Sequence, residues 1–346
     1  GVIAESGSAL DHWAYDEDST YATWYYEHYV GCDIYETEDE ILDCMRKVPF
    51  QDLVEASHTL SKEDRKHGLL GFRGCSPTIQ TFNDTKLDFD NILYQHPRDF
   101  MINRDFQDVP FLTGANREEG SLIVGAMYQG FLVPNNLTNN ATYLREEMLR
   151  DMLLSIAKSM QKRYCGHIDL ADLEVSQYCL IDIGGALLLK AGSWQMSNYH
   201  SYYSKYKTFY YSFEFDSDDS MGNWVKSKSS NLYTGITHAD ELQYIFAMPA
   251  IMDDFPGQKT VYERMTLLWT NFAKYLDPTP DEDSKWKDLD IPKWTPYEFE
   301  DPHFMVIDAN FTVLEDYSDR WTITNDQMGP KVEAKESEVK CAHKEG

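Results

Sequence analysis

Positive charge is scarce in this sequence of 346 residues, which has 31 Lys and Arg against 58 Asp and Glu. The resulting formal net charge of −27 repels phosphate backbones and anionic lipid headgroups. We therefore expect neither nucleic acid nor a membrane surface as a partner. Long apolar runs are also missing: the run at residues 183–189 contains two glycines and ends at Lys190, far short of a membrane span.

Motifs for cofactors and metals are missing as well. The sequence has no glycine-rich phosphate loop, no Cys-x-x-Cys pair, and no pair of its ten histidines at metal-ligand spacing. It therefore implies no cofactor and no metal. A chain of this length with 42% hydrophobic residues can bury the core of one large domain, to which we assign residues 1–330. The polar tail of residues 331–346 is expected to be disordered.

Six cysteines and four Asn-x-Ser/Thr sequons indicate an oxidising compartment. Because chance supplies some sequons in any long chain, it is their combination with an even cysteine count that carries the inference. We therefore predict a secreted or extracellular protein. Glycosylation is expected at four asparagines, which are Asn83, Asn136, Asn140 and Asn310.

The cysteines differ in how clearly they suggest a partner. Cys32 and Cys44 enclose a short acidic loop that fits no zinc motif, so we predict a disulfide, with two buried free thiols as the alternative. The other four could serve links to another segment of the protein. These four are Cys75, Cys165, Cys179 and Cys341. Cys165 and Cys179 could also form a local disulfide with each other, and Cys341, in the tail, could join two subunits as a homodimer.

Strand and helix patterns alternate along the chain. Apolar runs at residues 2–6 and 109–115, and a period-two pattern at residues 209–215, predict three strands of one sheet. Apolar residues at every fourth position predict a helix spanning residues 144–160, and a three-and-four rhythm predicts another over residues 261–275. This interleaving indicates the α/β class.

Two segments hold residues suited to catalysis. Residues 114–121, which include Glu119, follow the second predicted strand and so lie at the sheet edge where α/β enzymes place their sites. Residues 235–246 form a loop leading into a helix and hold His238 beside two acids. Taken alone, either segment can be purely structural, because acidic residues are common in solvated turns and at helix starts.

The same two segments resemble signature stretches of the carboxylesterase/cholinesterase family. In that family a G-x-N-x-(D/E)-E-G turn supplies the catalytic glutamate, matching Glu119, and a G-x-x-H-(A/G)-x-E-L-x-Y-x-F stretch supplies the catalytic histidine, matching His238. Residues 4–10 resemble a Q-S-G-S segment with Glu5 in place of the usual Gln, and the loop of residues 32–44 resembles the family's short disulfide loop. The resemblance covers residues 1–321 and implies the C-terminal part of an α/β-hydrolase fold.

One element of that family's site is absent from this sequence. The family's nucleophile is a serine in a G-x-S-x-G elbow, and no such pentapeptide occurs here. Ser6 is the nearest candidate, but Ala4 and Ser8 occupy positions where the elbow requires glycine, so we do not assign it. We expect the serine to belong to an upstream N-terminal segment of the same protein, which would pair with this chain. Without that segment the chain should not be an autonomous folding unit.

The resemblance implies a carboxylic ester hydrolase of the serine esterase type, acting on a small-molecule ester. His238 would be the general base, and Glu119 would orient its imidazole, so the chain alone would be inactive. The alternative is a non-catalytic, cholinesterase-like adhesion or interaction protein on the same fold. The presence of both residues favours the enzyme, and it predicts that a Glu119 carboxylate oxygen lies within hydrogen-bond reach of His238.

Overall fold

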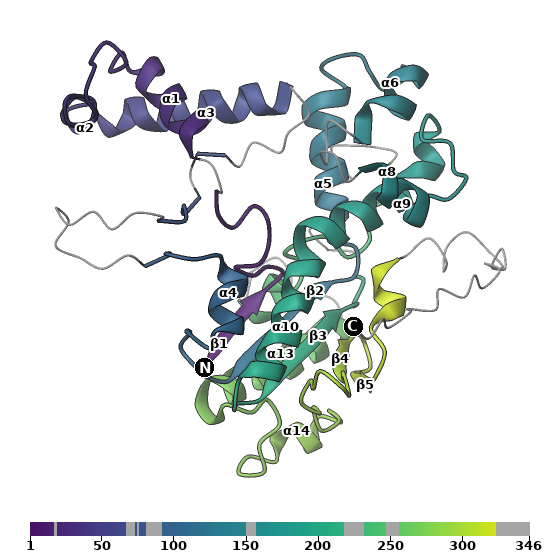
Figure 1. The fold of residues 1–346 in the computed structure, drawn as a ribbon. Coiled ribbons are helices and arrows are strands. Elements are labelled where there is room, and N and C mark those ends of the chain that lie inside the picture. Colours follow the sequence, from purple (N-terminus) through teal and green to yellow (C-terminus); the bar gives the residue numbers. More distant parts are fainter. Residues whose placement is uncertain are drawn as a thin grey trace, which may run out of the picture.

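The structure is a computed structural model that describes residues 1–16, 19–66, 73–74, 76–80, 92–149, 157–217, 232–246 and 256–322. Within these ranges the strands form one sheet in the order β1-β2-β3-β4-β5 (Figure 1). The first four run parallel, and β5 returns antiparallel to β4. The strands are β1 (Val2–Glu5), β2 (Phe111–Asn116), β3 (Thr208–Phe213), β4 (Phe304–Ile307) and β5 (Thr312–Leu314).

The three strands predicted from the sequence all belong to this sheet. The α/β class is therefore confirmed, with small shifts at the strand ends: β1 ends at Glu5, β2 begins at Phe111, and β3 ends at Phe213. Because the first four strands are parallel, their carboxyl ends meet at one edge of the sheet. Glu119 lies at this edge, because it belongs to the segment that directly follows β2.

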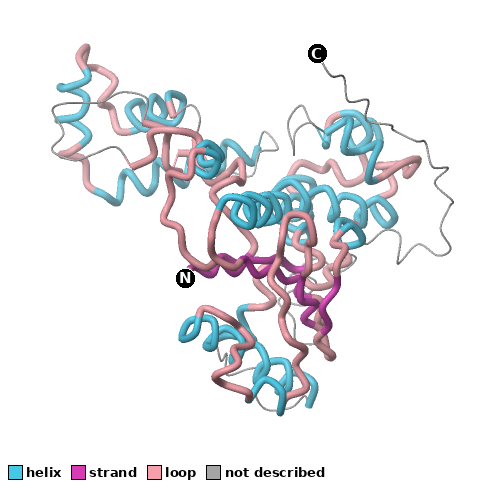
Figure 2. Tube along the Cα trace, turned by 60° about the horizontal axis from the view of Figure 1, so that its bottom comes forward, coloured by secondary structure: helices cyan, strands magenta, loops and turns pink. Residues whose placement is uncertain are grey.

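Alternation along β3 explains why the sheet is covered on both faces. Phe209, Tyr211 and Phe213 lie on one face, in a core with apolar residues of α13 (Pro256–Tyr275). Tyr210 lies on the other face, in a second core that Trp194 of α10 contacts. Successive strand side chains point to opposite faces, so one aromatic-rich strand supplies both cores. Figure 2 shows helices on both sides of the strands.

The helices begin and end where the sequence supplies local signals. The Thr37 hydroxyl accepts the amide N–H of Glu40 at the start of α2, and the Asp172 carboxylate accepts the amide of Val175 at the start of α9. Such caps satisfy amides that have no partner inside the helix. In the described part of the chain, the helices of eight or more residues besides α13 are α1 (Thr20–Tyr29), α2 (Glu38–Met45), α3 (Phe50–Lys66), α5 (Gly120–Met127), α8 (Ala157–Tyr164), α9 (Leu173–Gly185) and α10 (Ala191–Tyr203). The shorter ones are α4 (Pro97–Ile102), α6 (Ala141–Glu146), α12 (Leu242–Ile245) and α14 (Lys285–Asp288).

The helix expected over residues 261–275 is confirmed by α13, but the single helix expected over residues 144–160 is wrong. α6 ends at Glu146, and Glu147 has a φ of −114°, outside the helical range. Leu144, Met148 and Leu149 are nevertheless buried in one core. Buried residues at every fourth position are compatible with one long helix, but they are equally compatible with separate helical segments that pack into the same core. Residues 150–156 lie outside the described part of the chain.

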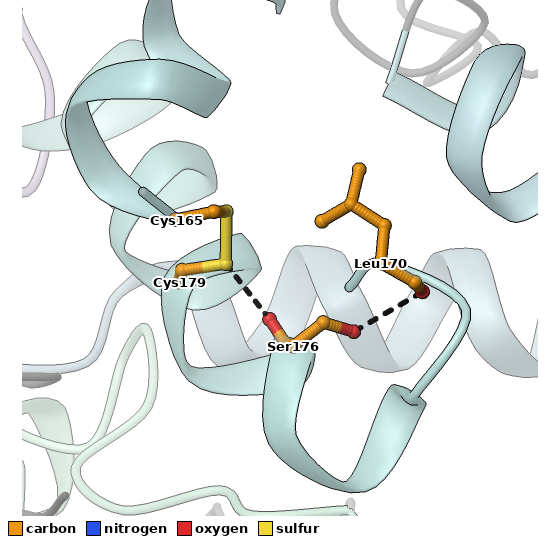
Figure 3. The surroundings of a disulfide bond; sticks show 4 residues. All are labelled: Cys165, Leu170, Ser176 and Cys179. Atoms are coloured by element: carbon orange, nitrogen blue, oxygen red, sulfur yellow. Dashed lines mark hydrogen bonds between the residues drawn. A yellow bond between two sulfur atoms is a disulfide. The ribbon is translucent and has the colours of Figure 1, made fainter. Parts of the chain in front are cut away.

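Two disulfides are present in the described residues. The predicted bond between Cys32 and Cys44 is confirmed, and it closes the acidic loop that contains α2. Cys165 and Cys179 form the second bond, which joins the end of α8 to α9 (Figure 3). Cys75 and Cys341 lie outside the described residues, so the homodimer bridge stays a prediction.

Removing the second disulfide should cost substantial stability. The bond closes a loop with a sequence separation of 14. Loop-closure entropy for a loop of this size corresponds to about 3 kcal/mol in free energy of unfolding. We expect that loss for the double variant Cys165→Ala/Cys179→Ala in urea unfolding of the whole protein. A loss under about 1 kcal/mol would show that the unfolded chain is not restrained by this bond.

Three of the four sequon asparagines are solvent-exposed, namely Asn136, Asn140 and Asn310. Asn83 and the tail of residues 331–346 lie outside the described ranges. Glycosylation of these positions and disorder of the tail stay predictions. None of the helices described here is long and apolar enough to cross a membrane.

Candidate active site

Glu119 lies at the carboxyl edge of the sheet, in the turn between β2 and α5. The amide of Asn116, the last residue of β2, donates to Glu119 Oε1 at 2.7 Å. The amide of Arg117 donates to the Phe213 carbonyl of the neighbouring strand at 2.9 Å. Glu119 is fully buried. The turn is thus fixed both to its own strand and to β3.

Close packing of two helices fixes the other side of this turn. Gly120, the first residue of α5, touches α9 so closely that an added Cβ would lie 1.9 Å from the Ile181 carbonyl oxygen. Gly184 and Gly185 of α9 face the same spot. Glycine is required here because any side chain would push the two helices apart. The turn that carries Glu119 is therefore held between the sheet and α9.

His238 lies on a loop whose backbone makes two unusual turns. Gly235 has a φ of +49°, and Ala239, directly after His238, has a φ of +70°. A non-glycine residue in this left-handed region is uncommon and costs about 1 kcal/mol. The Asp240 carboxylate holds the turn by accepting the Thr237 amide at 2.7 Å. The His238 side chain remains 32% exposed, whereas the side chain of Glu119 is completely covered.

The two candidates meet across the fold. His238 Nδ1 lies 2.8 Å from Glu119 Oε2, although 119 positions separate them in the sequence. A carboxylate can only accept a hydrogen bond, so Nδ1 carries the proton of the neutral imidazole and Nε2 has a free lone pair. Among the described residues, Nε2 makes no hydrogen bond. The contact predicted from the sequence is confirmed, and the catalytic roles of the two residues stay predictions.

The surroundings of His238 act on its basicity in opposite directions. Burial lowers the pKa of His238, but the hydrogen bond to Glu119 and the nearby negative charge outweigh burial. The pKa of His238 is therefore raised above its usual 6.5. A raised pKa means that Glu119 stabilises the imidazolium form, which is the form a general base acquires when it takes a proton.

A second buried acid, Glu241, lies behind this pair. It accepts from the Asn116 side-chain amide and, at 3.4 Å, from the Ser6 hydroxyl. Burial raises the pKa of Glu241 to about 8, and the charge of Glu119 adds to the effect. Burial therefore favours the neutral form of this carboxyl. The histidine pattern already contained this acid, but the sequence did not show that it would be buried against Ser6 and Asn116.

Ser6 occupies a position that does not suit a nucleophile. It follows β1 at the same sheet edge with a φ of +53°. Ser6 is 2% exposed, and its hydroxyl donates to Glu241, not to His238. A nucleophilic serine needs its proton taken by the base. The geometry thus agrees with leaving Ser6 unassigned.

No metal cluster accompanies the pair in the described residues. No group of three or more His, Cys, Asp or Glu in those ranges could hold a metal ion. A cavity of about 610 Å³ does occur elsewhere, lined by residues that include Tyr128, Arg145 and Asp172. It contains neither Glu119 nor His238, so it does not mark the site of their chemistry.

Comparison with known proteins identifies the family. The sequence model of the carboxylesterase family matches residues 1–323. The chain belongs to that family. Its α/β sheet is accordingly part of an α/β-hydrolase fold, as the sequence patterns implied.

Individual relatives of this carboxylesterase-family chain are distant and longer. It is 24% identical to the juvenile hormone esterase of Tribolium castaneum, over 89% of this chain and 54% of that protein. It is 22% identical to an acetylcholinesterase of Leptinotarsa decemlineata (81% of this chain, 41% of the relative) and 24% identical to neuroligin-3 of Mus musculus (80% and 32%). The chain thus spans about half or less of the length of these relatives.

Proposed function

We propose that this chain supplies the acid and the base of a serine esterase, and that a segment of the same protein outside these 346 residues supplies the nucleophile. The hydrogen bond between His238 Nδ1 and Glu119 Oε2 at the carboxyl edge of the sheet is the observation that carries the proposal. Membership of the carboxylesterase family supports ester hydrolysis as the reaction class. The substrate is a carboxylic ester, and the two disulfides and exposed sequons fit an extracellular location.

The roles follow from the tautomer that the pair enforces. His238 Nε2 takes the proton from the serine hydroxyl as the oxygen attacks the ester carbonyl, and then gives that proton to the departing alcohol. Glu119 holds the ring in orientation and stabilises the imidazolium while keeping its own negative charge. Water then cleaves the acyl-enzyme by the same proton transfers, which restores the serine.

The test is to treat the whole protein with a fluorophosphonate probe and to assay it with 4-nitrophenyl acetate. We expect stoichiometric labelling of one serine outside this chain, together with hydrolysis, and no labelling of the isolated chain. Labelling of Ser6 would overturn our assignment of the nucleophile. A folded whole protein that neither hydrolyses the ester nor takes up the probe would support the non-catalytic interaction protein, which the similarity to a neuroligin leaves in place.

The pH dependence of the reaction should reflect the raised pKa of His238. Only the neutral imidazole can act as base, and this form appears as the pH rises through the pKa of His238 in the folded protein. Because that pKa lies above 6.5, the acid limb of kcat/KM should have an apparent pKa above 6.5. A pH-rate profile with 4-nitrophenyl acetate measures it. An acid limb below that value would mean that Glu119 does not stabilise the charged ring.

A further inference from the structure

The residue before the catalytic acid joins the two halves of the site. The Glu118 amide donates to the Ile236 carbonyl at 3.1 Å, and the Ile236 amide donates back to Glu118 Oε2 at 2.9 Å. Ile236 lies two positions before His238. These reciprocal bonds therefore connect the turn that carries the acid directly to the loop that carries the base.

Gly235 allows this contact to be close. A Cβ added at Gly235 would lie 2.9 Å from Glu118 Cγ, and its φ of +49° disfavours any side chain. The Glu118 side chain thus lies against bare backbone of the histidine loop. Only 5% of Glu118 is exposed, so water does not compete for its bond to Ile236.

A buried lysine fixes the other end of the same turn. Lys190 ends the π-helical turn at Ala186–Lys190, between α9 and α10, and is 2% exposed. Its ammonium donates to the carbonyl of Arg117, directly before Glu118, and at 2.8 Å to the carbonyl of Arg320. π-Helical turns interrupt regular helices and are frequent at functional sites. Here the interruption lies where the long helical segment passes the Glu119 turn.

Burying the ionisable side chains of Glu118 and Lys190 costs folding free energy, so stability alone does not explain their presence here. Burial lowers the pKa of Lys190, an effect that the charge of Glu118 opposes. Burial likewise raises the pKa of Glu118, against its bond from Ile236 and the charges of Lys190 and Arg117. Apolar side chains of similar size usually fill such space at no loss of stability. Fixing the carbonyl of Arg117 and the amide of Ile236, by contrast, requires a donor and an acceptor at these two places.

We propose that Glu118 and Lys190 are positioning residues that keep Glu119 and His238 in the relative position needed for their hydrogen bond. The inference rests on the proposed function. Neither residue contacts the imidazole in the structure. Glu118 acts through the backbone of Ile236, and Lys190 acts through the carbonyl of Arg117.

The test uses the whole protein with three substitutions. Glu118→Leu and Lys190→Met should each lower kcat for 4-nitrophenyl acetate by about tenfold to a hundredfold, with little change in KM, because small misplacements of catalytic groups cost rates of this order. Glu118→Gln keeps an oxygen that can accept the Ile236 amide and should stay within about threefold of wild type. Rates are expressed per serine labelled by fluorophosphonate, so unfolded molecules are not counted. If one of Glu118→Leu and Lys190→Met fails to fold, kcat of the other still tests the proposal.

A control tests whether the loss of any lysine–carbonyl hydrogen bond lowers kcat. Lys293 donates to the Thr279 carbonyl and lies 3.3 Å from Asp281, away from Glu119 and His238. Because the Lys293 side chain is 47% exposed, Lys293→Met should leave kcat unchanged and shift the unfolding midpoint only slightly. If kcat is likewise unchanged in Glu118→Leu and Lys190→Met, their role is structural and the proposal fails.

Hydrogen exchange gives a readout that does not depend on catalysis. The Ile236 amide should exchange faster in Glu118→Leu than in Glu118→Gln, and the low-field proton resonance of His238 Nδ1 should move in Lys190→Met. If the wild-type protein neither hydrolyses the ester nor takes up the probe, the proposed serine esterase activity is wrong. The exchange rate and the resonance would still show whether Glu118 and Lys190 position Glu119 and His238. Unchanged exchange and an unchanged resonance would overturn it.

Discussion

Replacing His238 by alanine in the whole protein should lower kcat for ester hydrolysis by about 10⁴-fold to 10⁶-fold, with KM changed only slightly. In the mechanism that we propose, the variant removes the group that takes the serine proton and returns it to the leaving alcohol. Substrate binding does not depend on this proton transfer, so the effect should fall on kcat. Steady-state kinetics with 4-nitrophenyl acetate measures both constants.

Exposure of the His238 side chain makes this a clean experiment. Because 32% of the side chain is open to solvent, water can enter the space left by its truncation and hydrogen-bond to Glu119 Oε2. The thermal unfolding midpoint should therefore stay close to that of wild type. A loss in kcat of less than about a hundredfold would mean that another group is the base.

Replacing Glu119 by glutamine should lower kcat by about 10³-fold to 10⁴-fold, although the change is nearly isosteric. A glutamine amide can donate a hydrogen bond to Nδ1, which would leave the proton on Nε2, where the free lone pair is needed. Loss of the negative charge should also move the acid limb of kcat/KM to lower pH, because Glu119 is what raises the pKa of His238. Both effects follow from one substitution and are measured in one pH-rate series.

A second variant separates charge from geometry at this position. Glu119→Asp keeps the carboxylate but shortens the side chain, so it should keep more of the activity than the glutamine variant if charge and tautomer dominate. Equal losses in both variants would instead indicate that the exact reach of the side chain decides the rate. A Glu119→Gln variant with wild-type kcat and an unshifted acid limb would remove Glu119 from the mechanism.

Several acidic side chains are buried close to Glu119 and His238. Glu241 and Glu118 are buried beside Glu119, and burial raises the pKa of both. Charged carboxylates packed this closely would repel one another. Burial favours the neutral form of Glu241, which reduces the repulsion beside the hydrogen bond between Glu119 and His238.

Several features could be predicted from the sequence because they depend on short stretches of chain. Period-two aromatics in β3 and the apolar runs of β1 and β2 predict strands, since side-chain direction alternates with each residue. The short acidic loop between Cys32 and Cys44, which fits no zinc motif, predicts a disulfide between these two cysteines. The helix over residues 144–160 was predicted wrongly, because spacing alone does not reveal that α6 ends at Glu146 while the following residues still reach the same core.

The sequence by itself determined which residues are candidates for the acid and the base, since each lies in a local pattern that can be read without the fold. Only the tertiary structure decided that Glu119 Oε2 and His238 Nδ1 are 2.8 Å apart, because parallel strands bring chain segments together whose separation in sequence carries no information about distance. The fold likewise decided that Lys190 and Glu241 are buried next to this pair. Burial depends on what packs around a side chain, and for both residues those neighbours come from distant parts of the chain.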